Sequence, residues 1–107
     1  MVKVRGVNVF PEAVGGVLAS ERRSNGEYGC IVERVGVEQR EEMTVLVEVT
    51  HAAVDRAQLQ ADLERRFKEV LGVRLIVEVV ERGKTEEYTG TSRTSKIKRL
   101  LDRRLST

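Results

Sequence analysis

The residues best suited to chemistry lie near the end of the chain, in the run T-G-T-S-R-T-S-K-I-K-R over residues 89–99. Hydroxyl side chains, a glycine and Lys96 gather there, where an amphipathic helix is expected to begin. The free backbone N–H groups and the positive end of the helix dipole at such a position favour an anion. A lysine in the first turn has the wrong charge for that dipole, so an anionic ligand would relieve the repulsion. The run indicates an anion site or, as the alternative, a solvated loop followed by a basic helix face.

The charge of the chain is concentrated in the same region. The 107 residues carry 19 basic and 17 acidic side chains and a net charge of +2. From residue 91 onward six basic side chains outnumber one acid, which is a local charge of +5. Nucleic acid is one anionic partner for such a tail, but two Phe, two Tyr and no Trp provide no stacking platform, and we do not expect it. The acidic pair Glu41–Glu42 is interpreted as solvated surface.

The composition disfavours several other kinds of site. The single Cys30 lies in an apolar, strand-like run and is expected to be buried. His51 is also alone, so neither a metal site nor a histidine-based triad is expected. No apolar run approaches the roughly 20 residues of a membrane span, and the first residues do not form the apolar centre of a signal peptide. We expect a cytoplasmic protein with no metal site and no membrane association, and the length allows one domain, residues 1–107.

The elements that must position these residues follow from the spacing of apolar side chains. Valines alternate with polar residues over 2–9 on both sides of Gly6, which predicts two short strands joined by a turn or bulge. Pro11 then suits the first turn of a short helix. This helix contains Gly15 and Gly16, each of which disfavours it by roughly 1 kcal/mol relative to Ala. It must therefore depend on tertiary packing.

The rest of the chain alternates strands with helices. Strands are predicted over 28–35, 43–50 and 74–81. Between the last two lies a long helix, with Asp55 as its N-cap and Gly72 as its stop. A polar loop over 83–95 leads to a short C-terminal helix, marked by apolar residues at helical spacing: Ile97, Leu100, Leu101 and Leu105. This order predicts an α+β fold, a mainly antiparallel three- to four-stranded sheet with helices packed against it, in the ferredoxin-like order β-α-β-β-α-β plus a C-terminal helix.

The opening K-V-R-G-V-N-V-F-P (3–11) and the closing S-K-I-K-R-L-L-D-R-R (95–104) together resemble one known domain. It is the C-terminal domain of the phenylacetate–coenzyme A ligase branch of the acyl-adenylate-forming enzymes. Members of that branch carry a strand segment similar to the opening motif, then a helix, and near the end a segment G-K-x-K-R-V-x-D with the catalytic lysine. The intervening order of elements also fits, so the resemblance covers essentially the whole chain. Ser95 stands here where the family carries a glycine before the lysine.

The resemblance implies a division of roles between two domains. In that family a large N-terminal domain binds ATP and the carboxylic acid, and the small C-terminal domain rotates between two uses. In the first use its lysine acts as the acyl-AMP forms. In the second its strand–glycine segment helps to shape the channel for the coenzyme A thiol arm. By motif position the catalytic residue would be Lys96, and the channel edge would be formed by Lys3, Val4, Arg5, Gly6, Val7 and Asn8.

The same resemblance implies substrates and partners. ATP and coenzyme A would be substrates of the complete enzyme, with Mg²⁺ bound by the large domain and no cofactor bound by this chain alone. The partner would be an N-terminal adenylation domain in cis or in trans, and a homodimer remains open. The implied function is adenylation of a carboxylic, aryl acid and its transfer to coenzyme A, with the isolated chain inactive. The family's hinge precedes the opening motif, so we expect the chain to begin just after a hinge.

A different class of function also fits the predicted fold. A ferredoxin-like or ACT-like module that binds a small ligand, or its own twin, would use the same order of elements. The sequence carries no ATP pocket of its own, as expected for such a module. A regulatory module is therefore the alternative to a ligase domain.

Overall fold

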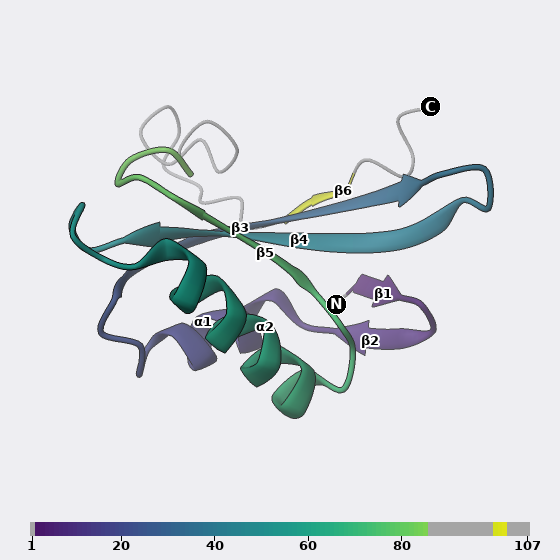
Figure 1. The fold of residues 1–107 in the computed structure, drawn as a ribbon. Helices are drawn as coiled ribbons and strands as arrows, with labels where there is room; N and C mark the ends of the chain where they lie inside the picture. Colours follow the sequence, from purple (N-terminus) through teal and green to yellow (C-terminus); the bar gives the residue numbers. More distant parts are fainter. Residues whose placement is uncertain (1, 86–99, 103–107) are drawn as a thin grey trace, which may run out of the picture.

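The computed structural model describes residues 2–85 and 100–102, and Figure 1 shows a sheet with α1 and α2 on one side of it. In chain order the elements are β1 (Val2–Val4), β2 (Val7–Val9), α1 (Pro11–Leu18), β3 (Ser24–Val35), β4 (Arg40–Val49), α2 (Arg56–Leu71), β5 (Ile76–Val80) and β6 (Leu100–Asp102). The predicted α+β class is confirmed, and so is the predicted order of elements as far as β5.

The main sheet is mixed, and the expectation of a mainly antiparallel sheet is wrong. Its strands lie in the order β5-β4-β3-β6. β3 and β4 form a long antiparallel hairpin, whereas β5 runs parallel to β4 and β6 runs parallel to β3. The reason for the parallel pairing of β5 is α2, which carries the chain back along the sheet before β5 begins. Such a crossover lets the next strand run in the same direction as the last.

The predicted C-terminal helix is wrong where the structure describes it. Leu100–Asp102 forms β6, whose register pairs Leu100 with Cys30 and Asp102 with Val32 of β3. The other residues of the predicted helix lie outside the described residues. A short apolar run fits a strand as well as a helix by its periodicity. The backbone groups along β3 need hydrogen-bond partners, and a neighbouring strand supplies them.

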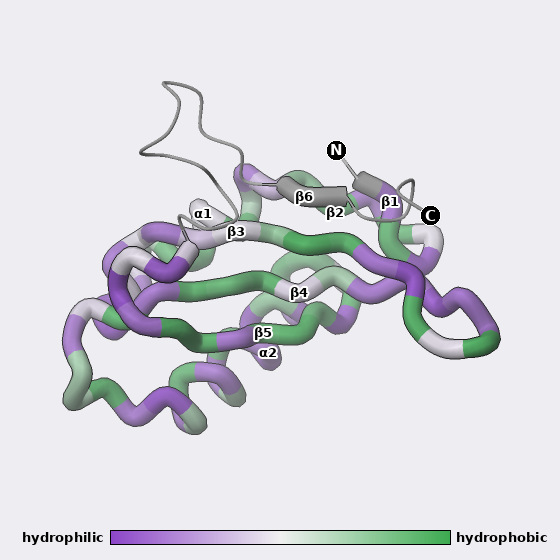
Figure 2. Tube along the Cα trace, turned by 90° about the horizontal axis from the view of Figure 1, so that it is seen from above, coloured by the Kyte–Doolittle hydropathy of each residue, from purple (hydrophilic) through white to green (hydrophobic). Residues whose placement is uncertain are grey.

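The hydrophobic core lies between the sheet and the two helices. Alternate residues of β3, β4 and β5 face the helices, because successive side chains of a strand point to opposite faces. In Figure 2 the central parts of β3 and β4 are coloured mainly as hydrophobic, and so is β5 on both sides of its middle. From α2 come Leu59, Leu63 and Phe67, at a spacing of four residues and with no exposed surface. Cys30 is buried as predicted, with 1% of its surface exposed.

The glycine-containing helix α1 is held by Tyr28 of β3. A Cβ atom placed on Gly15 would lie 3.1 Å from the Tyr28 side chain, so the ring packs directly on the helix backbone. The Tyr28 hydroxyl donates a hydrogen bond to the Pro11 carbonyl oxygen at 3.0 Å. Pro11 begins the helix, as predicted. The tertiary packing that this helix needs is therefore supplied in part by one aromatic side chain.

α2 begins and ends where the sequence predicts. Asp55 Oδ1 accepts a hydrogen bond from the backbone N–H of Gln58 at 3.1 Å, which caps the first turn. Gly72 follows the last turn with a φ of 76°, in the left-handed region that glycine enters most easily. The helix between them carries the chain from the end of β4 to the start of β5.

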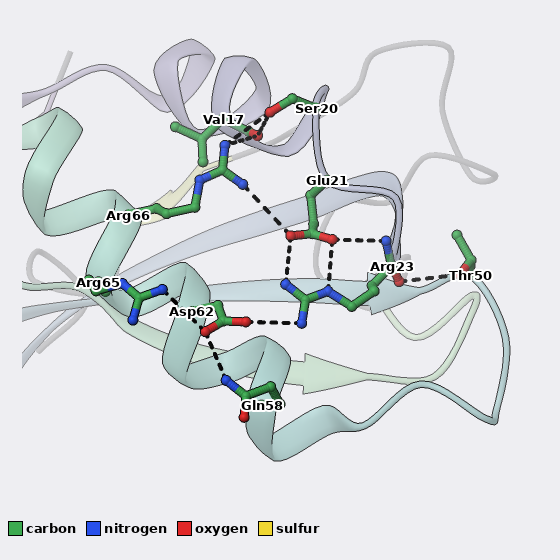
Figure 3. Close-up of polar contacts among 9 residues, drawn as sticks. All are labelled: Val17, Ser20, Glu21, Arg23, Thr50, Gln58, Asp62, Arg65 and Arg66. Atoms are coloured by element: carbon green, nitrogen blue, oxygen red, sulfur yellow. Dashed lines mark hydrogen bonds and ion pairs between the residues drawn. The ribbon is translucent and has the colours of Figure 1, made fainter.

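A cluster of ion pairs connects the segment after α1 to α2 (Figure 3). The Arg23 guanidinium donates two hydrogen bonds to the Glu21 carboxylate, both at 2.9 Å, and one to Asp62 at 3.0 Å. The Arg23 backbone N–H donates a third bond to the Glu21 carboxylate, at 3.0 Å. Arg66 lies 3.7 Å from the same Glu21 carboxylate and donates to the Ser20 hydroxyl at 2.9 Å. The hydrogen bonds from Arg23 lower the pKa of Glu21 from 4.5 to about 2. The cluster joins two elements that are far apart in sequence.

We expect this cluster to make the stability of the fold depend on pH. Because the pKa of Glu21 is lowered on folding, its stabilising effect is fully present above about pH 4.5 and is lost as the pH falls toward 2. A shift of this size corresponds to a stabilisation on the order of 3 kcal/mol at neutral pH. Urea unfolding measured across this pH range should show a shallower loss of stability in acid for Glu21→Gln than for the unchanged chain. The control is Glu38→Gln, at an exposed position. If the free energy of unfolding fell equally steeply in acid for the unchanged chain and both variants, the role of Glu21 would be contradicted.

Candidate functional site

The β1–β2 hairpin contains the whole of the predicted channel edge. The register pairs, from the open end to the turn, are Val2–Val9, Lys3–Asn8 and Val4–Val7. Arg5 and Gly6 form the two-residue turn, with φ angles of 51° and 80°. Two consecutive positive φ angles are typical of a type I′ turn, in which glycine is favoured. The predicted strand–turn–strand is confirmed, and a tight turn rather than a bulge joins the two strands.

The hairpin presents one face to the core and the other outward. Val4 and Val9 have no exposed surface, so they anchor the hairpin to the core. Lys3 and Asn8 lie opposite each other on the outward face and are exposed, and so are the two turn residues. Val7 is half-buried against the core. Val4 is thus a structural residue of the predicted edge, and a ligand could reach Lys3, Asn8 and the turn.

The turn is fastened to the start of β4. The backbone N–H of Arg5 donates to Glu41 Oε1 at 3.1 Å, and its side-chain Nε donates to the Glu41 carbonyl oxygen at 3.0 Å. Arg5 Nη2 also lies 3.5 Å from Glu42 Oε1. The interpretation of Glu41–Glu42 as solvated surface is therefore wrong, because the pair holds the turn that carries Gly6. No local pattern reveals a contact between residues 36 positions apart.

A pocket of about 270 Å³ opens beside this turn. It is lined by Arg5, Arg40, Glu42, Met43, Arg74 and Ile76, and we call it the arginine pocket. Its three guanidinium groups and one carboxylate make the lining cationic. Arg40 and Arg74 carry no signal in the sequence, because only the pairing of β4 with β5 brings them to one place.

Lys96, the predicted catalytic residue, lies outside the described residues, as does most of the predicted loop over 83–95. The structure describes how the chain is held just before this region. Thr85 donates two hydrogen bonds to Glu48 Oε2, one from its backbone N–H at 3.0 Å and one from its hydroxyl. Asn25 Nδ2 donates to Glu48 Oε1 at 2.9 Å. The carboxylate of Glu48 thus joins β3, β4 and the residue at which the described part of this loop ends.

Glu48 is a buried carboxylate with 3% of its surface exposed. Burial raises its pKa, but the hydrogen bonds from Thr85 and Asn25 outweigh burial and hold the pKa below its ordinary value. The group is therefore ionised at neutral pH. One signal in the sequence points to it, the single acid within the apolar stretch V-L-V-E-V (45–49), because a buried strand carboxylate requires donors.

The described residues lack two further kinds of feature. They contain no group of three or more His, Cys, Asp or Glu side chains placed to hold a metal ion. No helix in this part of the chain is long and apolar enough to cross a membrane. His51 is exposed just after β4.

The chain is similar in sequence and structure to one family of domains. The family model described as the AMP-binding enzyme C-terminal domain matches residues 6–104. The fold is similar to the crystal structure of a domain of phenylacetate-coenzyme A ligase from Bacteroides vulgatus ATCC 8482, with a TM-score of 0.80 and 27% identity. That match covers 100% of this chain and 95% of that domain. No curated protein matches this chain in sequence.

Two structures of 2-hydroxyisobutyryl-CoA ligase are also similar. One is a complex with 2-HIB-AMP and CoA in the thioesterification state, at a TM-score of 0.79 and 28% identity, and the match covers 98% of this chain. The other is the postadenylation state with R3-HIB-AMP, at a TM-score of 0.74 and 25% identity, covering 95% of this chain. In both cases this chain spans 21% of the length of the ligase.

Proposed function

Because the chain belongs to the family of AMP-binding enzyme C-terminal domains, we propose that it is the small domain of an acid–CoA ligase. The complete enzyme would form an acyl-AMP from ATP and a carboxylic acid, and then a coenzyme A thioester. The observation that carries the proposal is the fold match to a ligase solved with 2-HIB-AMP and CoA. The family match favours this function over an ACT-like regulatory module. A large N-terminal domain, in cis or in trans, would supply the sites for ATP, Mg²⁺ and the acid.

Lys96 is the residue we assign to the first step. In that step the carboxylate of the acid attacks the α-phosphate of ATP, and pyrophosphate leaves. Negative charge accumulates around the α-phosphate as the new bond forms. An ammonium group placed there stabilises this charge most strongly in a site that excludes water. The assignment rests on the motif S-K-I-K-R, in which Lys96 occupies the lysine position of the family.

The outward face of the β1–β2 hairpin is the surface we assign to the second step. In that step the coenzyme A thiol attacks the acyl carbonyl carbon, and AMP leaves. Gly6 has no side chain, so the backbone can approach a partner domain or the thiol arm closely. The buried valines and the bonds between Arg5 and Glu41 hold this face in place. The change between the two steps would be a rotation of the small domain as a rigid body.

The proposal is tested by reconstitution with a large adenylation domain of the same family. ATP–pyrophosphate exchange is measured with and without the chain, for acids that include phenylacetate and 2-hydroxyisobutyrate. We expect acid-dependent exchange to rise when the chain is added, because Lys96 then reaches the α-phosphate. Addition of the Lys96→Ala chain should give no such rise. Equal exchange without the chain, with it and with the variant would refute the proposed function.

Gly6→Asn is expected to slow thioester formation while leaving the hairpin folded. Asparagine tolerates a positive φ better than other residues with a Cβ, so the turn should persist. No described atom lies within 4 Å of a Cβ placed on Gly6, so an effect on catalysis must come from a partner domain or from coenzyme A. We expect thioester formation from preformed acyl-AMP to fall about tenfold, because small displacements at a reacting centre are costly. Acyl-AMP formation should not change.

The matched control for this variant is Gly36→Asn in the connection between β3 and β4. Gly36 also has a positive φ, of 78°, and a Cβ placed there likewise meets nothing within 4 Å. Urea unfolding of both variants checks that the fold is retained. Equal losses of thioester formation in the two variants would contradict the role of the hairpin.

A further inference from the structure

Glu48 of β4 lies on the face of the sheet that the helices do not cover. Its neighbours Val47 and Val49 belong to the core between the sheet and the helices, and successive side chains of a strand point to opposite faces. Even so, only 3% of the Glu48 surface is exposed. A carboxylate buried in this way is unfavourable unless hydrogen-bond donors surround it, so its position requires partners as well as packing.

The donors to this carboxylate come from two separate segments. Asn25, near the start of β3, donates to Oε1, whereas Thr85 donates to Oε2 from both its backbone N–H and its hydroxyl. Thr85 has 2% of its surface exposed, although residues 81–84 just before it are all exposed. Thr85 is therefore the point at which this polar connection is attached to the sheet.

A tight turn brings Thr85 to the carboxylate. The backbone N–H of Lys84 donates to the Glu81 carbonyl oxygen at 3.2 Å, and Gly83 between them has a φ of 86°. The parallel register pairs Val80, the last residue of β5, with Glu48. The chain therefore passes Glu48 twice, first at the end of β5 and again at Thr85.

This attachment precedes Lys96 in the chain. Lys96 follows Thr85 by 11 residues, and β6 begins at Leu100, four residues after Lys96. β6 pairs with β3, which is the antiparallel partner of β4. The described residues on the two sides of Lys96 are thus attached to the same hairpin, to β4 before the lysine and to β3 after it.

We propose that Glu48 is a positioning residue for Lys96 and acts through its hydrogen bonds to Thr85. The inference rests on the proposed function, in which Lys96 stabilises the charge that develops at the α-phosphate. An apolar side chain at position 48 would avoid the desolvation of a charge, but it would not hold Thr85 in one orientation. Charge-assisted hydrogen bonds are directional, so the carboxylate fixes both where and in which direction the segment that contains Lys96 begins.

The test measures both half-reactions in the complex with a large adenylation domain. Thr85→Val keeps the shape of the side chain but removes the hydroxyl donor, whereas Thr85→Ser keeps the donor. We expect Thr85→Val to slow single-turnover formation of acyl-AMP about tenfold, because small displacements of a reacting group are costly. Thr85→Ser should retain most of the rate. Thioester formation from preformed acyl-AMP should be unchanged in both variants, since that step does not use Lys96.

A double variant separates positioning from structural support. If Thr85 acts through Lys96, the addition of Thr85→Val to Lys96→Ala should slow acyl-AMP formation no further. A substitution that only destabilises the fold would lower the rate in either background and would lower thioester formation equally. Urea unfolding of each chain verifies that it is folded under the conditions of the assay.

The matched control is Thr50→Val, which makes the same substitution two residues after Glu48. The Thr50 hydroxyl donates to the Arg23 carbonyl oxygen at 3.3 Å, so this variant also loses one hydrogen bond. It should leave both half-reactions intact. The proposal would be overturned by an unchanged rate in Thr85→Val, by an equal loss in Thr85→Ser or Thr50→Val, by equal losses in the two half-reactions, or by a further loss in the Lys96→Ala background.

The positioning role and the proposed function can fail separately in this assay. A large loss in Lys96→Ala with an unchanged rate in Thr85→Val would overturn the positioning role alone. Equal acyl-AMP formation without the chain, with it and with Lys96→Ala would instead refute the proposed function, on which the positioning role depends.

Discussion

Lys96→Ala is expected to lower the rate of acyl-AMP formation by about 100-fold or more in a complex with a large adenylation domain, the range typical for loss of one group that stabilises a developing anion. The effect should be confined to this step, because the ammonium group acts where the α-phosphate is attacked. Single-turnover formation of acyl-AMP measures the first step. Thioester formation from preformed acyl-AMP measures the second, which should remain within a fewfold of the unchanged chain.

The matched control for this variant is Lys98→Ala. Lys98 lies two residues further along the same motif and carries the same charge, so its removal changes the electrostatics of the tail equally. We expect it to leave acyl-AMP formation largely intact. If Lys98→Ala lowered the rate of acyl-AMP formation as much as Lys96→Ala, both lysines would act only through the overall positive charge of the tail. That result would contradict the assignment of Lys96 by motif position.

Glu48→Gln is expected to lower the free energy of unfolding by roughly 2–3 kcal/mol, because hydrogen bonds to a buried charged group are replaced by at least one unfavourable contact. The two oxygens of Glu48 accept from Asn25 on one side and from Thr85 on the other. A glutamine amide would turn an N–H₂ group toward one of these donors. Urea unfolding at neutral pH measures the loss.

The pH dependence of this effect follows from the lowered pKa of Glu48. A carboxyl whose pKa is lowered on folding stabilises the fold above its ordinary pKa, and this stabilisation is lost in acid. The difference in stability between Glu48→Gln and the unchanged chain should therefore shrink as the pH falls. The control is Glu78→Gln on the exposed face of β5, which should change stability by no more than about 0.5 kcal/mol. Equal losses at the two positions would show that the hydrogen bonds of Glu48 contribute nothing.

The features that the sequence predicts correctly are governed by neighbouring residues. The turn at Gly6 follows from two alternating valine runs with a glycine between them, and the structure places Arg5 and Gly6 in the expected turn. The caps of α2 at Asp55 and Gly72 are likewise set by residues within one helical turn. The terminal motifs also identify the family, which the match over residues 6–104 confirms.

The features that the sequence misses depend on residues that are far apart along the chain. Leu100 and Leu101 fit a helix by spacing, but pairing with β3 makes them part of a strand. The direction of β5 depends on where α2 returns the chain, which apolar periodicity does not encode. The acids Glu41 and Glu42 have the composition of a solvated surface, yet they bind Arg5, which precedes Glu41 by 36 residues in the chain.

The sequence by itself determines the local turns, the helix caps, the burial pattern and the family of this chain. The turns and caps arise from backbone dihedrals and short-range hydrogen bonds, for which nearby residues are sufficient. The burial pattern follows from the spacing of apolar residues, and the family follows from the two terminal motifs. Only the tertiary structure decides which polar and charged groups meet, such as Glu48 with Thr85, or Arg5 with Arg40 and Arg74. Contacts of this kind form when strands pair and a core closes, so their free energy is shared among segments dozens of residues apart. For that reason the hairpin could be recognised from its own residues, whereas the pocket beside it could not.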